Sequence, residues 1–194
     1  MDRGYKRMME IEMTKTVFGI FPSTDEADKV IADLEEMGFG KEDISVVMRK
    51  EGVPPRETRG TEVARDAGAG VATGGAIGGV AGLIIGIAAI TIPGVGALIV
   101  AGPLAIALGL VEVGGTTLAG AITGAAAGGV IGALVGLGVP KPSAKEYEVA
   151  VRKGQILLAV NTPEEKEEKV RDVFDKHGAA QVCSVKQPAK GAKA

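Results

Sequence analysis

A chain of 194 residues can form one domain with an insertion or two small domains. The formal net charge of −2 gives no global reason to expect a nucleic-acid partner, and we expect none. The single cysteine, Cys183, excludes an internal disulfide and suits a reducing compartment. The opening residues lack the apolar core of a secretory signal, so we expect a cytoplasmic protein or one facing the cytoplasm.

The first structural unit is predicted over residues 14–50, after a flexible leader of residues 1–13. The β-branched and aromatic run Thr14–Phe21 indicates a strand. Ser23 and Glu26 have the spacing of a capping box, and a helix is predicted from there to Gly38. Its buried side is predicted to hold Ala27, Val30, Ile31, Leu34 and Met37. A second strand over Ile44–Met48 completes a β-α-β unit.

A glycine-rich apolar segment follows over residues 66–140, with Glu112 as the only charged residue between Asp66 and Lys141. Glycine recurs at every fourth position in two copies of an internal repeat. Residues four apart lie on one face of a helix, so each copy predicts a stripe without side chains where another helix packs closely. We therefore expect a glycine-zipper helical hairpin whose packing residues are Gly70, Gly74, Gly78, Gly82, Gly86, Gly120, Gly124, Gly128, Gly132 and Gly136.

The middle of the segment, Ile92–Thr117, contains Pro93 and Pro103, which break any single long helix. A bend and one or two short helices are predicted there. Glu112 has two interpretations. In the first, it is a functional acid in apolar surroundings. In the second, which we favour, it belongs to a polar turn before the second glycine helix.

The last unit is predicted over residues 141–186. Ser143 with Glu146 and Thr162 with Glu165 have capping-box spacing, so one helix is expected to end at Gly154 and another at Gly178. Strands are expected over Gln155–Val160 and Ala180–Val185, and residues 187–194 are expected to be a flexible tail.

Two β-α-β units predict an α+β fold, a ferredoxin-like antiparallel sandwich with two helices on one face of a four-stranded sheet. The glycine-zipper hairpin is inserted between its halves. Both halves can pair only if the insert leaves and returns on the same side of the domain.

Nothing in the sequence predicts a catalytic, cofactor-binding or metal-binding site. Catalysis by a nucleophile needs a base beside it, and a metal needs several converging ligands. His177, the only histidine, is expected to end a helix, where a cation suits the helix dipole. Cys183 is expected to be a packed strand residue.

Three segments resemble the bacterial heat-induced or general stress protein family: Thr16–Ala27, Ile92–Leu108 and Gly138–Val160. They read TVFGIFPSTDEA, IPGVGALIVAGPLAIAL and GVPKPSAKEYEVAVRKGQILLAV. The resemblance implies a stress-associated, non-enzymatic protein and supplies no catalytic residues.

Two functions remain open. In the first, Ala67–Ile92 and Thr116–Val139 form helices long enough to cross a bilayer, and the α+β domain faces the cytoplasm at the cytoplasmic membrane. In the second, the hairpins form the core of a water-soluble homo-oligomer that acts as a scaffold or binds a small ligand. Membrane lipid and further copies of the chain are therefore the expected partners.

Overall fold

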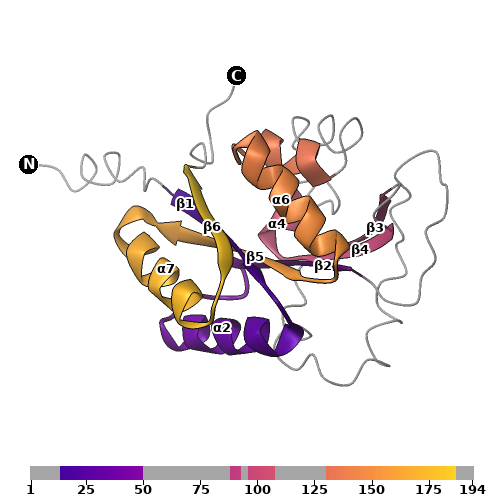
Figure 1. The fold of residues 1–194 in the computed structure, drawn as a ribbon. Helices are drawn as coiled ribbons and strands as arrows, with labels where there is room; N and C mark the ends of the chain where they lie inside the picture. The colour runs from indigo at the N-terminus through magenta and orange to yellow at the C-terminus, as the bar shows by residue number, and fades with distance from the viewer. Residues whose placement is uncertain (1–13, 50–87, 93–95, 108–129, 187–194) are drawn as a thin grey trace, which may run out of the picture.

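A computed structural model describes residues 14–49, 88–92, 96–107 and 130–186 (Figure 1). Its elements are, in chain order, β1 (Thr14–Phe21), α2 (Thr24–Glu36), β2 (Ile44–Arg49), β3 (Ala88–Ile92), β4 (Gly96–Ala101), α4 (Pro103–Ala107), α6 (Lys141–Arg152), β5 (Ile156–Pro163), the 3-10 turn η2 (Glu164–Lys166), α7 (Glu167–Lys176) and β6 (Ala180–Lys186). The predicted leader and tail lie outside the described residues.

The six strands form one sheet in the order β3-β4-β2-β5-β1-β6. Every neighbouring pair in it is antiparallel, so the protein has the predicted α+β character. The central pair is long, because β1 runs beside β5 from Thr14 opposite Pro163 to Phe21 opposite Ile156.

Helices cover both faces of this sheet (Figure 1). Side chains along β1 point alternately to the two faces of the sheet, so they contribute to two separate hydrophobic cores. Val17 and Phe21 pack in the core that contains the buried residues of α2 and α7. Phe18 and Ile20 pack in the other core, which contains Tyr147 of α6. The layer on the α6 side was not anticipated from the sequence.

The predicted start of α2 is confirmed, because the Ser23 hydroxyl accepts a hydrogen bond from the Glu26 N–H at 3.3 Å. The helix ends before Gly38, and α7 ends before Gly178, as predicted. Four of the five residues expected on the buried side of α2 are buried: Ala27, Val30, Ile31 and Leu34.

The other two capping boxes are wrong. Helix α6 begins at Lys141, directly after Pro140, and has no side-chain cap, so Ser143 lies inside its first turn. Proline early in a helix needs no amide partner and favours this earlier start. Strand β5 continues through Pro163, where the buried Thr162 hydroxyl donates to the Pro163 carbonyl at 3.2 Å. Thr162 therefore cannot cap α7.

The glycine-rich segment is not wholly helical, which corrects the prediction for residues 66–140. Strands β3 and β4 pair with each other, and β4 extends the sheet from β2. Isoleucine, threonine and valine in the sequences AAITI and GALIVA favour strands. A short helix, α4, does follow, as the prolines predicted.

Gly102 allows the backbone between β4 and α4 to lie close to the backbone of β2. It has a φ of +85°, and a Cβ atom there would lie 2.2 Å from the Ile44 carbonyl oxygen, so no larger residue fits. Beyond it, the buried Leu104 N–H donates to the Ser45 hydroxyl at 2.9 Å. Backbone contact and this hydrogen bond attach the glycine-rich segment to β2.

Candidate functional site

Only the end of the second glycine stripe falls within the described residues. Gly132 and Gly136 lie in a helix over residues 130–136. The remaining predicted packing glycines, and Glu112, lie outside the described part of the chain. Their proposed contacts therefore remain predictions.

The helix over residues 130–136 has one packed and one open side. Val130, Ala133 and Leu134 are buried in the core on the α6 side of the sheet. Gly136 is exposed, and a Cβ atom added there would meet no atom within 4 Å. Val135 beside it is 40% exposed. In the part of the chain that the structure describes, this end of the stripe is therefore uncovered at Gly136.

His177 and Cys183 occupy the structural positions predicted for them. His177 follows the last turn of α7, and its Nε2 atom lies 2.9 Å from Asp33 Oδ2 on α2. The Lys176 ammonium donates to the same carboxylate at 2.7 Å and is the first cause of the lowered pKa of Asp33, with His177 second. Cys183 is partly buried in β6 against the core on the α6 side. Within the described ranges, no group of three or more His, Cys, Asp or Glu side chains could hold a metal ion.

A second ionic cluster joins β1 to α7. The Lys15 ammonium lies 2.5 Å from Glu167 and 2.8 Å from Glu164. Arg171 donates to Glu167 at 3.2 Å and to the Ser184 hydroxyl of β6 at 2.8 Å. Hydrogen bonding from Lys15 is the main reason why the pKa of Glu167 is lowered to about 2. All charges here are partnered within the domain, so the cluster stabilises the fold.

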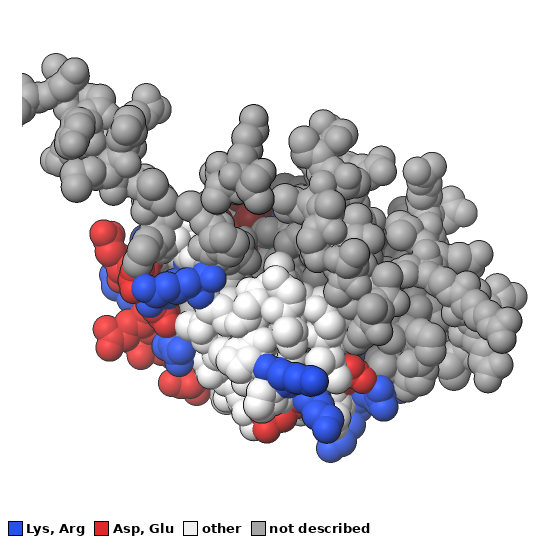
Figure 2. All heavy atoms as spheres, turned by 90° about the horizontal axis from the view of Figure 1, so that it is seen from above, with Lys and Arg blue, Asp and Glu red and all other residues white. Residues whose placement is uncertain are grey.

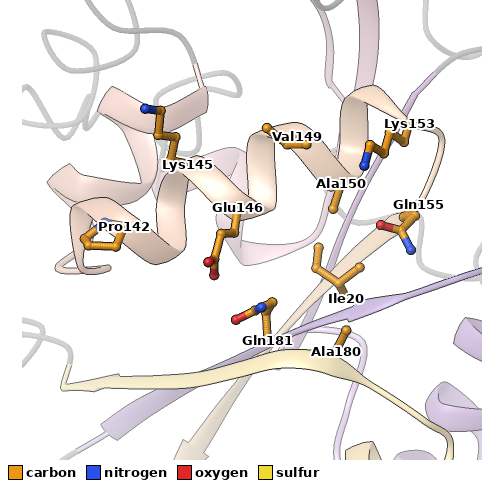
Figure 3. Close-up of a pocket in the computed structure, with 10 residues that line it drawn as sticks. All are labelled: Ile20, Pro142, Lys145, Glu146, Val149, Ala150, Lys153, Gln155, Ala180 and Gln181. Atoms are coloured by element: carbon orange, nitrogen blue, oxygen red, sulfur yellow. The ribbon is translucent and has the colours of Figure 1, made fainter.

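A cleft lies between α6 and the beginning of β6. It has a volume of about 560 Å³ and is lined by Ile20, Pro142, Lys145, Glu146, Val149, Ala150, Lys153, Gln155, Ala180 and Gln181 (Figure 3). We call it the α6–β6 cleft. Viewed from the side of α6, the molecular surface has a broad area without charged side chains between charged groups at its ends (Figure 2).

A β-bulge forms one wall of the α6–β6 cleft. Pairing of β1 with β6 shifts between Phe18 and Ile20, and Gln181 has a φ of +54°. The Tyr147 hydroxyl donates to the Gln181 carbonyl at 2.5 Å, which ties the bulge to α6. Burial is the main cause that raises the pKa of Tyr147. The bulge was not predicted, because a sequence run such as AAQVCSV contains no signal for an extra residue in a strand.

Among the described residues, no helix combines the length and the apolar character needed to cross a membrane. Comparisons of the chain with protein-family models, with curated proteins and with solved structures gave no match.

Proposed function

We propose that this chain is a non-enzymatic, stress-associated structural protein that assembles with further copies of itself through its glycine stripes. The observation that carries the proposal is the uncovered end of the second stripe at Gly136. That helix already buries Val130, Ala133 and Leu134 in its own domain. Within the described residues Gly136 is exposed and Gly132 partly exposed, and we propose that a second helix packs against this side at close distance.

The domain that presents the stripe is proposed to be ferredoxin-like. Leaving aside β3 and β4, the remaining strands have the order β2-β5-β1-β6. The two strand-helix-strand units β1-α2-β2 and β5-α7-β6 place their helices in one core, on one face of that sheet. Both features support a ferredoxin-like unit, to which α6 adds a layer on the other face.

The stress role is supported by the resemblance of three segments of the sequence to the heat-induced or general stress protein family. The non-enzymatic role is supported by the same resemblance, which supplies no catalytic residues. We propose a cytoplasmic location for the assembled protein.

Membrane association is the second candidate. It is favoured by the run between Asp66 and Lys141, in which Glu112 is the only charged residue. About 20 apolar residues in a helix suffice to cross a bilayer. In this case the α+β domain lies on the cytoplasmic face of the cytoplasmic membrane. The expected spans Ala67–Ile92 and Thr116–Val139 would then have to be shorter, because β3 and the helix over residues 130–136 belong to the domain.

Substitution of Gly136 tests the assembly. Gly136→Leu adds a side chain where the domain has open space, so folding should be unaffected. If the stripe contacts another copy, the added side chain forces the helices apart, and overpacking typically costs about 1–3 kcal/mol. We expect a smaller assembly in sedimentation velocity. Lys169→Leu, at an exposed position on α7, is the matched control and should not change the assembly.

An unchanged sedimentation coefficient for Gly136→Leu would overturn the assembly through this stripe. Fractionation of cells distinguishes the second candidate. Protein that stays in the membrane pellet after alkaline carbonate washing would support membrane insertion, whereas complete release would refute it.

A further inference from the structure

We propose that the α6–β6 cleft binds a small zwitterion that has an apolar middle and opposite charges about 10 Å apart. The distance follows from Glu146 and Lys153, which lie seven residues apart on α6 at about 1.5 Å of rise per residue. This inference concerns a different surface from the glycine stripe and does not depend on the assembly.

The size and the apolar lining of the cleft suit a small molecule. Its volume of about 560 Å³ falls within the usual range of about 300–1,000 Å³ for such sites. Ile20 and Ala150 are buried at its base, and Ala180 lies at its edge. Val149 is 45% exposed on its rim, and is one of two large hydrophobic side chains exposed among the described residues. A ligand with an apolar middle would cover Val149.

The polar groups of the cleft gather at its two ends. Glu146 and Gln181 lie close together at one end, while Lys153 and Gln155 lie at the other (Figure 3). Lys145 also lines the cleft, but its ammonium group points away from Gln181 and Ile20 (Figure 3). A cationic group of the ligand would therefore face Glu146, and an anionic group would face Lys153.

These charges are available to a ligand. Within the described ranges, neither Glu146 nor Lys153 makes an ion pair, whereas Glu148 and Arg152 on the same helix pair with each other. A hydrogen bond to a charged group contributes about 1.5–3 kcal/mol, which corresponds to roughly tenfold or more in affinity.

The bulge in β6 holds one end of the cleft in a fixed shape. A non-glycine residue with positive φ is uncommon, and bulges often re-aim a side chain beside a functional site. Here the bulge carries Gln181 toward Glu146 (Figure 3). Its carbonyl is fixed by Tyr147, whose ring is fully buried and stacks on Phe18 at 6.1 Å. The backbone at Gln181 is thus fixed before any ligand arrives, while its side chain is exposed to the cleft.

Two kinds of small zwitterion have this chemistry: a free tripeptide, which spans about 10 Å when extended, and a linear ω-amino acid. We propose titrating the full chain with Ala-Leu-Ala and with 8-aminooctanoic acid, with calorimetry as the readout. Dissociation constants of the order of 1 mM or lower are expected for at least one probe. The same tripeptide with acetylated and amidated ends, which lacks both charges, should bind at least about tenfold more weakly.

Charge reversal provides the decisive comparison. Glu146→Lys and Lys153→Glu should each abolish detectable binding, because the groups at the two ends of the cleft then carry like charges. The double variant restores opposite charges in reversed order, and a zwitterion can bind it in the opposite direction, so binding should return. Glu168→Lys, an exposed change on α7, is the matched control and should bind normally.

Circular dichroism and thermal melting establish that each variant is folded. No binding of either probe to the wild type, or equal binding of the capped peptide, would overturn the proposal. Binding that survives either single reversal, or that is lost in a folded double variant, would also overturn it.

Discussion

Gly19 is the residue of β1 on which the packing of α7 depends most closely. A Cβ atom at this position would lie 2.6 Å from Cδ2 and 2.9 Å from Cε2 of Phe174. Phe174 is fully buried, and its ring meets Phe21 edge to face at 5.2 Å. Since carbon atoms normally approach to about 3.5–4.0 Å, Gly19→Ala requires the ring to retreat by about 1 Å.

The expected loss of stability follows from two opposing effects. Overpacking of a filled core typically costs about 1–3 kcal/mol. Replacing glycine with alanine also restricts the unfolded chain, which offsets about 0.4–1 kcal/mol. We expect Gly19→Ala to lower the free energy of unfolding by about 1–2 kcal/mol. This corresponds to a fall in Tm of about 2–8 °C for a chain of this size.

Thermal and urea melts of a double-mutant cycle with Phe174→Leu provide the test. Phe174→Leu alone should destabilise the protein, because it removes the ring pair and leaves a cavity. In that background Gly19→Ala should cost much less, since the ring edge that it strikes is gone. Wild-type stability of Gly19→Ala, or the same cost in both backgrounds, would refute the packing argument.

Two further predictions concern polar contacts. The pKa of Glu167 is lowered from 4.5 to about 2, with the Lys15 hydrogen bond as the first cause, so its ionised form stabilises the folded state. That contribution is complete above the unfolded pKa of about 4.5 and disappears as pH falls toward 2. Glu167→Gln should therefore lower the free energy of unfolding by about 1–2 kcal/mol at pH 7 and by almost nothing near pH 2. Urea melts that show the same stability difference at both pH values would contradict this. Ser45→Ala leaves the buried Leu104 N–H without its partner and should cost about 1–3 kcal/mol, whereas Ser45→Thr, which keeps a hydroxyl, should cost less. Equal losses for both variants would show that the hydrogen bond is not the cause.

The outer elements could be predicted because their signals are local. The run Thr14–Phe21 has the composition of a strand, and Ser23 and Gly38 mark the two ends of the next helix. Helix α7 likewise has its buried residues at helical spacing. These patterns depend on residues that are close in the sequence, so they can be recognised without knowledge of the fold.

The glycine-rich segment was harder to predict because its structure depends on distant partners. Its composition does not distinguish a buried helix from a strand that completes the edge of a sheet. Strand β4 forms because β2 offers a free edge, and Gly102 allows the backbones to meet. The described part of the segment over residues 66–140 therefore belongs to the folded domain and is not a separable insert. Without it, buried core residues such as Leu98 and Leu134 would be missing, and β2 would keep β5 but lose β4 on its other edge.

The α6–β6 cleft could not be predicted at all. The buried residues Tyr147, Ala150 and Val151 of α6 have helical spacing, which favours a helix but does not indicate which face of the sheet it covers. The cleft arises only when that choice is combined with a bulge at Gln181.

The position of β1 in the sheet has a consequence for synthesis on the ribosome. Both of its neighbours, β5 and β6, are encoded near the end of the chain. The nascent β1, which ends at Phe21, therefore waits for its hydrogen-bonding partners until the chain has been translated beyond Ile156. Throughout that interval its apolar side chains and the whole glycine-rich segment are available to wrong partners. Pairing between the two ends of the chain also makes folding slow, because distant segments must meet first. We therefore expect the yield of folded protein to fall when translation is prolonged or chaperone capacity is exhausted.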